Sequence, residues 1–182
     1  VHETSRGRLV LVAGEAGIGK TALVRAFCAE RRALTAACDA LYTPRPLGPF
    51  VDLAEEVGGE LAGVLEADPA PGELVAALSR ELRRRAPAIL LLEDLHWADE
   101  ATLDLLRLLA RRIESLPALL VATFRDDELD RGHPLRTVLG ELPARAVERL
   151  VLPRLSVAAV EELAGEAHLD AGELHRHTAG NP

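Results

Sequence analysis

The sequence has no apolar run long enough to cross a lipid bilayer. Apolar residues make up 48% of its 182 residues, but unbroken runs such as AILLL at 88–92 hold only a handful of residues. A membrane-spanning helix needs about 20 such residues. The sequence also lacks the pattern of a signal peptide. It therefore predicts neither a membrane span nor a secretory signal.

Positive charge is also scarce. The 21 Lys and Arg residues are outnumbered by 29 Asp and Glu, which gives a formal net charge of −8. No basic stripe is long enough to follow a nucleic-acid backbone. The one basic cluster, RELRRRAP at 80–87, ends a helical pattern, where cations complement the helix dipole and face water. We expect no direct nucleic-acid binding by this segment.

Methionine is absent, even from position 1, and cysteine occurs only twice. The spacing of Cys28 and Cys38 fits no metal site, so we expect reduced thiols in a cytoplasmic protein. Cys28 is expected to pack as a small buried residue. The missing first methionine predicts that the chain is a segment of a longer protein.

Short apolar runs typical of strands alternate with longer stretches of helical period. This order predicts an α/β fold, a parallel sheet with helices on both faces. Continuous apolar character predicts strands that are buried on both sides. Expected strands are 8–13, 34–38, 88–92, 118–123 and 147–152. Expected helices are 21–32, 50–66, 73–85 and 99–113, with a proline-rich loop at 39–49.

Two of these helices have a clear apolar face. In the first, Leu23, Ala26 and Phe27 lie on one side. In the fourth, Asp99 is placed to cap the N-terminus. Its expected apolar face comprises Leu103, Leu106, Leu109, Ala110 and Ile113.

The pattern changes after Leu152. Two helical stretches, 156–168 and 170–180, follow with no strand between them. We expect a core domain at 1–152 and the beginning of a helical, lid-like subdomain at 153–182.

Lysine occurs once, at position 20, although arginine occurs 20 times. Lys20 lies in GEAGIGKT, which matches a phosphate-binding loop (P-loop) and stands between an apolar strand and an amphipathic helix. Its amides and the helix N-terminus would hold phosphate oxygens, while Lys20 bridges the β- and γ-phosphates and Thr21 binds Mg²⁺. A planar, longer arginine does not fit this position. The predicted nucleotide-binding residues are Gly14, Glu15, Ala16, Gly17, Ile18, Gly19, Lys20 and Thr21.

Two further strands are expected to end in polar residues at the same edge of the sheet. The run AILLLED ends in Glu93 and Asp94, which can hold Mg²⁺ and polarise an attacking water. The run LLVATFRD places Arg125 where a cation could contact the γ-phosphate. On its own, Arg125 beside two aspartates is more typical of a surface ion pair.

These blocks, together with EDLHWAD and the closing TAGNP, resemble the STAND branch of AAA+-like P-loop ATPases. The resemblance is strongest to the ATPase module of large LuxR-type bacterial transcriptional regulators. It implies a three-layer sandwich with a mainly parallel five-stranded sheet. In that sheet the strand ending in Arg125 lies between the P-loop strand and the strand ending in Glu93.

The resemblance also implies residue roles. Residues 14–21 would form the Walker A loop, Glu93 and Asp94 the Walker B acids, and Arg125 the sensor arginine. Gly180-Asn181-Pro182 would be the signature that lies against the nucleotide. Because the family more often has aspartate at position 93, the metal-holding and water-activating roles of the two acids stay open. His96 and Trp97 are interpreted as loop packing, because the sequence supplies no proton-transfer partner for His96.

The sequence therefore predicts a module that binds ATP and Mg²⁺ and hydrolyses ATP slowly, as a switch for other domains of its parent chain. Oligomerisation is left open. The alternatives are a nucleotide-binding scaffold without turnover and a P-loop kinase of a small acceptor. A GTPase is disfavoured, because the only asparagine is Asn181 and the guanine-reading N-K-x-D pattern cannot occur.

Overall fold

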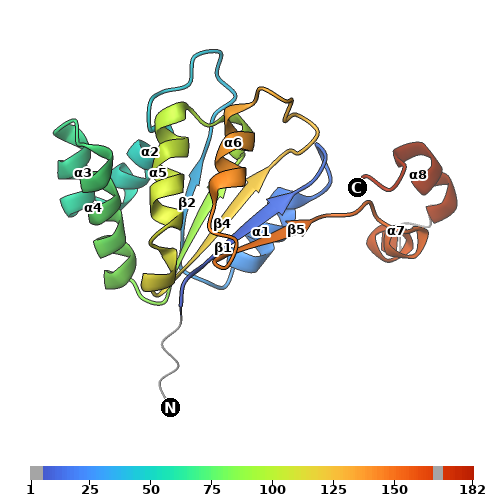
Figure 1. The fold of residues 1–182 in the computed structure, drawn as a ribbon. Helices are drawn as coiled ribbons and strands as arrows, with labels where there is room; N and C mark the ends of the chain where they lie inside the picture. Colours follow the sequence, from blue (N-terminus) through green and yellow to red (C-terminus); the bar gives the residue numbers. More distant parts are fainter. Residues whose placement is uncertain (1–5, 166–169) are drawn as a thin grey trace.

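The structure is a computed structural model that describes residues 6–165 and 170–182. At its centre lies a sheet of five parallel strands in the order β2-β3-β4-β1-β5 (Figure 1). The strands are β1 (Arg8–Ala13), β2 (Ala33–Ala37), β3 (Ala88–Glu93), β4 (Ala118–Phe124) and β5 (Val147–Val151). Each lies within a residue or two of its expected position. The predicted α/β class and the central place of β4, between β1 and β3, are confirmed.

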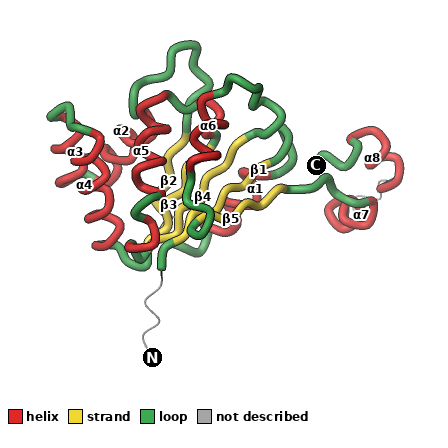
Figure 2. The backbone as a smooth tube through the Cα atoms, viewed as in Figure 1, coloured by secondary structure: helices red, strands yellow, loops and turns green. Residues whose placement is uncertain are grey.

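Helices connect the strands and follow the last one (Figure 2). They are α1 (Lys20–Cys28), α2 (Gly48–Val57), α3 (Gly59–Glu66), α4 (Pro71–Arg84), α5 (Glu100–Ala110), α6 (Pro134–Glu141), α7 (Val157–Ala164) and α8 (Ala171–Thr178). Two short 3-10 turns are η1 (Leu95–Trp97) and η2 (Ile113–Ser115). Each strand from β1 to β4 is followed by a crossover segment, as parallel pairing requires.

The two faces of the sheet are covered unequally. The main core lies between one face and the helices α2 to α6, where side chains such as Leu90, Leu120 and Phe124 are fully buried. A smaller cluster lies on the other face, where Val24 of α1 packs against Val12. These three layers are α1, the sheet, and the group formed by α2 to α6.

Helix α1 differs from the expected pattern. It ends at Cys28, not Arg32, and it turns Val24 and the half-buried Cys28 towards the sheet. Leu23 and Phe27, expected on the apolar face, are 43% and 38% exposed. A single helix over this sheet face buries only a narrow stripe, so its neighbouring apolar positions stay in solvent.

Two other helical predictions need correction. The expected single helix at 50–66 is divided into α2 and α3 at Gly58 and Gly59, which both have positive φ angles that glycine adopts at low cost. Helix α6 was not predicted at all. In contrast, the predicted cap of α5 is confirmed, because the Asp99 side chain accepts hydrogen bonds from the amides of Ala101 and Thr102.

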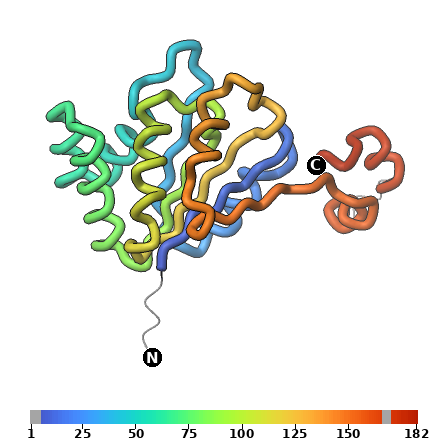
Figure 3. Tube along the Cα trace, viewed as in Figure 1, coloured from blue at the N-terminus to red at the C-terminus, as the bar shows by residue number. Residues whose placement is uncertain are grey.

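The strand β5 is also less buried than its apolar sequence indicates. It forms one edge of the sheet, and Leu150 and Val151 are 46% and 53% exposed. The two helices α7 and α8 then pack on each other beyond β5, at the end of the sheet where β1 runs into its following loop (Figure 3). This position brings the end of the described chain back towards residues 14–21.

Candidate functional site

The P-loop, residues 14–21, connects the carboxyl end of β1 to the N-terminus of α1. Gly17 and Gly19 have φ angles of 77° and 95°, which side-chain-bearing residues rarely adopt. The turn that they make leaves the first amides of α1 without partners in the helix, as at every helix start. A loop of this shape holds anions by its amides and by the positive end of the helix dipole.

Lys20 is buried beneath this loop. Its Nζ donates hydrogen bonds to the carbonyl oxygens of Gly14 and Glu15, each at 2.7 Å. Burial lowers the pKa of Lys20, and the positive charge of Arg125 lowers it further, while nearby aspartates oppose both effects. The two carbonyl oxygens are neutral, so they do not balance the charge of the ammonium. A multiply charged anion would supply the missing counter-charge and stabilise the charged form of Lys20.

Glu93 is the last residue of β3, and only 3% of its surface is exposed. One carboxylate oxygen, Oε2, lies 3.2 Å from Nη2 of Arg25 on α1. The other, Oε1, has no hydrogen-bond partner among residues 6–165 and 170–182. A buried carboxylate oxygen costs free energy unless something binds it. Its environment fits a water or a metal-bound water at this position.

Asp94 follows directly in a left-handed conformation, with φ of 58°. Its backbone N–H donates a hydrogen bond of 3.0 Å to the hydroxyl of Thr123, which is fully buried at the end of β4. The neighbouring strand therefore holds Asp94 in a backbone conformation that few residues adopt. Such strained positions are concentrated at functional sites.

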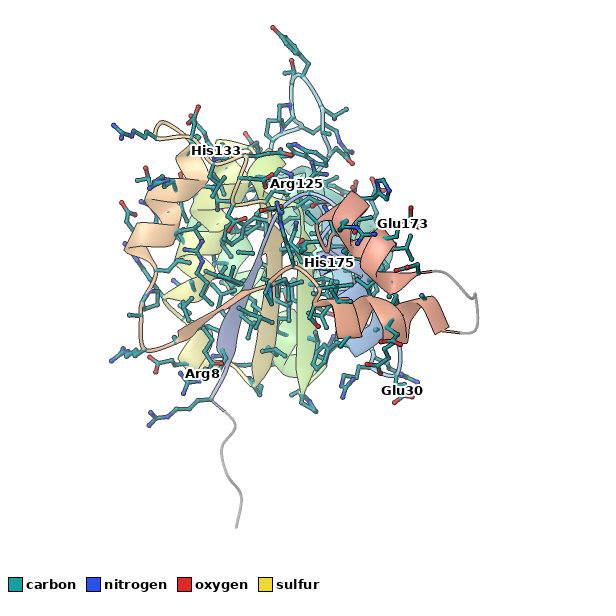
Figure 4. The ribbon with its side chains drawn as sticks, turned by 90° about the vertical axis from the view of Figure 1, so that its right-hand side faces the viewer. Arg8, Glu30, Arg125, His133, Glu173 and His175 are labelled. Carbon is teal, nitrogen blue, oxygen red and sulfur yellow. The ribbon has the colours of Figure 1, made fainter. Side chains whose placement is uncertain are left out.

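Arg125 follows β4 at the same edge of the sheet. Figure 4 places it at the opposite end of the sheet from Arg8, which begins β1. Its guanidinium lies 5.0 Å from the ring centre of Trp97 and forms an ion pair with Glu128. Its positive charge is close enough to Lys20 to lower the pKa of that lysine.

The segment around α8 also contacts the P-loop. The side-chain amide of Asn181 donates a hydrogen bond of 2.9 Å to the carbonyl oxygen of Ala16. Arg154, just after β5, forms an ion pair of 2.7 Å with Glu15. A Cβ atom built on Gly17 would lie 3.1 Å from Asn181 Oδ1, so glycine at this position permits the close approach.

The site gathers the residues that the sequence predicted from three separate strand ends. The P-loop, the acid pair and Arg125 all lie at the carboxyl edge of adjacent strands β1, β4 and β3. Sequence reasoning missed Arg25, Arg154 and Glu128. No local signal indicates Arg25 or Arg154, because their partners are 68 and 139 residues away. Glu128 is only three residues from its partner Arg125, and the neighbouring aspartates drew attention away from it.

These residues fit a nucleotide and Mg²⁺. The amide-rich loop with its buried lysine suits phosphate oxygens, and the unpaired oxygen of Glu93 suits a metal-bound water. In the described part of the chain, no group of three or more His, Cys, Asp and Glu side chains could hold a metal by itself. Mg²⁺ characteristically takes one or two protein carboxylates and binds substrate phosphates as well.

A large cavity of about 800 Å³ lies elsewhere, at the amino edge of the sheet. It is lined by the arginines Arg6, Arg8, Arg31, Arg32, Arg84 and Arg85 around an apolar floor. Four of them follow or end helices α1 and α4, where cations complement the helix dipole. Arg84 and Arg85 pair with Glu81, in agreement with the predicted solvated helix end.

A family model described as the AAA ATPase domain matches residues 1–122. The chain belongs to the AAA ATPase domain family. This membership implies a nucleotide-binding ATPase module, in agreement with the phosphate-binding loop and the acids at the sheet edge.

Individual proteins are also similar to this chain. An uncharacterized protein of Rhizobium meliloti (strain 1021) is 33% identical over 139 residues, which are 72% of this chain and 13% of that protein. Among solved structures, a Signal Transduction ATPase with Numerous Domains (STAND) protein from Pyrococcus horikoshii, with a tetratricopeptide repeat sensor, has a TM-score of 0.62 at 19% identity. That match covers 98% of this chain and 26% of the Pyrococcus chain. At this identity it shows a shared fold.

A further similar structure, the FIGL-1 AAA domain in complex with ADP, has a TM-score of 0.47 at 15% identity, over 88% of this chain and 47% of that one. The chain spans about a quarter or less of the first two proteins. No helix in the described ranges is long and apolar enough to cross a membrane.

Proposed function

We propose that this domain binds Mg-ATP and hydrolyses it slowly, and that it acts as a regulatory switch within a larger signalling or transcription-regulatory protein of the LuxR type. One observation carries the proposal: the P-loop, the acids after β3 and the arginine after β4 lie together at one sheet edge, and the segment around α8 contacts the same loop.

Residues 14–21 would bind the phosphate tail of ATP. On this proposal, Lys20 leaves the carbonyls of Gly14 and Glu15 and donates to phosphate oxygens, while the amides at the start of α1 hold the β-phosphate. The lysine already lies at the loop, so its movement costs little conformational entropy.

Thr21, Glu93 and Asp94 would hold Mg²⁺ and direct water. When bound, Mg²⁺ neutralises developing charge on the phosphate oxygens. The unpaired oxygen of the buried Glu93 supports a role for that residue in holding the metal's water shell. Asp94, fixed by Thr123, would then orient the attacking water and take its proton. Arg125 would contact the γ-phosphate and stabilise charge in the transition state.

The segment after Pro153 would transmit the state of the site. Asn181 binds the carbonyl oxygen of Ala16, and Arg154 binds the side chain of Glu15. A movement of the P-loop would therefore displace the residues that flank α7 and α8. We propose residues 1–152 as the ATPase core and 153–182 as the beginning of the subdomain that responds.

Phosphate release tests the enzymatic part. The domain should release phosphate from Mg-ATP, whereas Asp94→Asn should still bind ATP but release no phosphate above background. Asparagine tolerates the left-handed conformation of position 94, so the fold should be retained. Circular dichroism and thermal unfolding serve as the controls for folding. Wild-type turnover by Asp94→Asn would refute the role given to this residue.

The same assay separates the alternatives. ATP binding without phosphate release by the wild-type domain would favour a scaffold that holds nucleotide. Phosphate transfer only after addition of a small-molecule acceptor would favour a kinase. The paired acids of Glu93 and Asp94 favour water as the acceptor, because one residue can hold the metal while the other accepts the water's proton.

A further inference from the structure

Glu128 is the immediate ionic partner of Arg125. It lies three residues further along the chain, and its Oε1 is 2.5 Å from Nη1 of Arg125. The guanidinium is thereby held over the ring of Trp97. Both charged side chains are partly exposed, at 28% for Arg125 and 37% for Glu128. Arg125 can therefore move without exposing a buried core.

The second oxygen of Glu128 faces a different donor. Its Oε2 lies 3.6 Å from Nε2 of His96, whose side chain is only 1% exposed. The Nδ1 atom of His96 accepts the backbone N–H of Arg125 at 3.4 Å. In the neutral ring the hydrogen is therefore on Nε2. This buried Nε2 has no hydrogen-bond partner within the described ranges.

His96 is held both at its ring and at its backbone. Its ring centre lies 4.5 Å from that of Trp97. His133, which caps α6, contacts the carbonyl oxygen of His96 through Nε2 at 3.0 Å. The loop-packing interpretation of His96 and Trp97 is thus incomplete, because the packing also aims an N–H donor at Glu128.

We propose that Glu128 is a positioning residue that exchanges partners, bound to Arg125 before ATP arrives and to the buried N–H of His96 once Arg125 has turned to the γ-phosphate. This inference rests on the proposed function. ADP has no γ-phosphate, so the exchange accompanies ATP alone. In the wild-type domain, ATP binding has to break the Arg125–Glu128 pair, and the free energy that this costs lowers the affinity for ATP. Glu128 therefore sets how strongly the site prefers ATP over ADP.

Nucleotide affinities measured by calorimetry test this partner exchange. Glu128→Gln should bind Mg-ATP about two- to fivefold more tightly than wild type, the range for a partly exposed ion pair, with unchanged affinity for Mg-ADP. In an Arg125→Ala background the same substitution should have no effect. Weaker ATP binding, or an equal shift for ATP and ADP, would overturn the proposal.

Asp127→Asn is the matched control, because it removes an exposed negative charge one residue away from Glu128. If the loss of a negative charge near the site were the cause, Asp127→Asn would also change the affinity, and it would do so for both nucleotides. Glu128→Gln alone should change their ratio. If the wild-type domain binds neither nucleotide, the proposed function fails; if it binds both and Glu128→Gln leaves the ratio unchanged, only the partner exchange fails.

Trp97 provides a direct readout, since it is the only tryptophan in the sequence. Departure of the guanidinium from its ring should change its fluorescence when Mg-ATP is added, and Mg-ADP should leave it unchanged. Without nucleotide, the Glu128→Gln variant should already show part of the fluorescence change that ATP causes in the wild-type domain. Identical responses to ATP and ADP in the wild-type domain would contradict the exchange.

Two substitutions test the role of the unpaired N–H group of His96. His96→Gln retains an N–H group near the position of Nε2 and should keep most of the preference for ATP. His96→Leu removes it and should reduce ATP affinity relative to ADP. If His96→Leu does not fold, the comparison of His96→Gln with wild type remains, and an abolished preference in His96→Gln would count against the exchange.

Discussion

The side-chain amide of Asn181 binds the carbonyl oxygen of Ala16 at 2.9 Å, across a sequence separation of 165 residues. This contact joins the segment after α8 directly to the phosphate-binding loop. Pro182 extends it, because a Cβ on Gly19 would lie 3.8 Å from the proline ring. The loop that would hold phosphate and the segment that would respond to it are therefore in physical contact.

We predict that Asn181→Ala loosens α8 in the nucleotide-free domain. The lost hydrogen bond is worth about 1 kcal/mol, so amide hydrogen exchange in residues 171–178 should be about fivefold faster. Exchange in β1 and β4 should be unchanged. The control is Arg176→Ala, which removes an exposed side chain on the same helix. Equal exchange in Asn181→Ala and wild type would show that the contact does not hold α8 in place.

We predict that Arg25→Ala destabilises the fold by about 1–2 kcal/mol, because it leaves the buried carboxylate of Glu93 without its charged partner. Adding Glu93→Gln to this variant should restore part of the loss, since the amide carries no charge. Urea unfolding measures both effects. Arg136→Ala, at an exposed position on α6, is the control. A stability loss no larger than that control would contradict the prediction.

We predict that Thr123→Val slows phosphate release by roughly two- to tenfold and leaves ATP affinity near the wild-type value, because it removes the hydroxyl that holds the Asp94 amide. The exposed Thr137→Val on α6 is the matched control. Single-turnover assays measure the chemical step. If Thr123→Val hydrolyses ATP at the wild-type rate, the hydrogen bond to Asp94 has no part in catalysis.

Cys38 predicts a pH dependence of stability. Burial raises the pKa of its thiol from 9.0 to about 12. Between these values the unfolded chain loses the thiol proton and the folded chain keeps it, so the stability due to this group is complete below pH 9.0 and is lost as the pH rises towards 12. The loss approaches about 1.4 kcal/mol per pH unit.

Urea unfolding of wild type and Cys38→Ala between about pH 8 and about pH 10 tests this. The free energy of unfolding should fall less steeply with pH in Cys38→Ala. The pKa of Cys28 is also raised by burial, but Cys28 is present in both proteins and cancels in the comparison. Equal slopes would mean that the Cys38 thiol titrates at the same pH in the folded and unfolded chains.

The strands were predicted within one or two residues because continuous apolar runs are a strong local signal. The P-loop was predicted because its pattern needs only eight adjacent residues. Helix α6 was missed: it has only eight residues, it includes Gly140, and only Leu135 and Val138 in it are buried. The exposure of Leu23 and Phe27 was missed because it depends on how few helices cover that sheet face.

Contacts between distant residues could not be predicted from the sequence, because they too depend on how the helices pack on the sheet. Arg25 is one of twenty arginines, and nothing around it indicates which acid it meets. The partner of Glu93 is set by the packing of α1 on the sheet, which exists only in the folded chain. The unpaired oxygen Oε1 of Glu93, which supports the proposed role of this residue, is likewise visible only in the folded chain.

Calorimetric titration of Mg-ATP into the wild-type domain and Lys20→Ala tests the central claim most directly. Wild type should bind, and the variant should bind about 100-fold or more weakly, because it loses about two charge-assisted hydrogen bonds to phosphate. Arg136→Ala should bind like wild type. Equal affinities of wild type and Lys20→Ala would show that the triphosphate is not held at this loop.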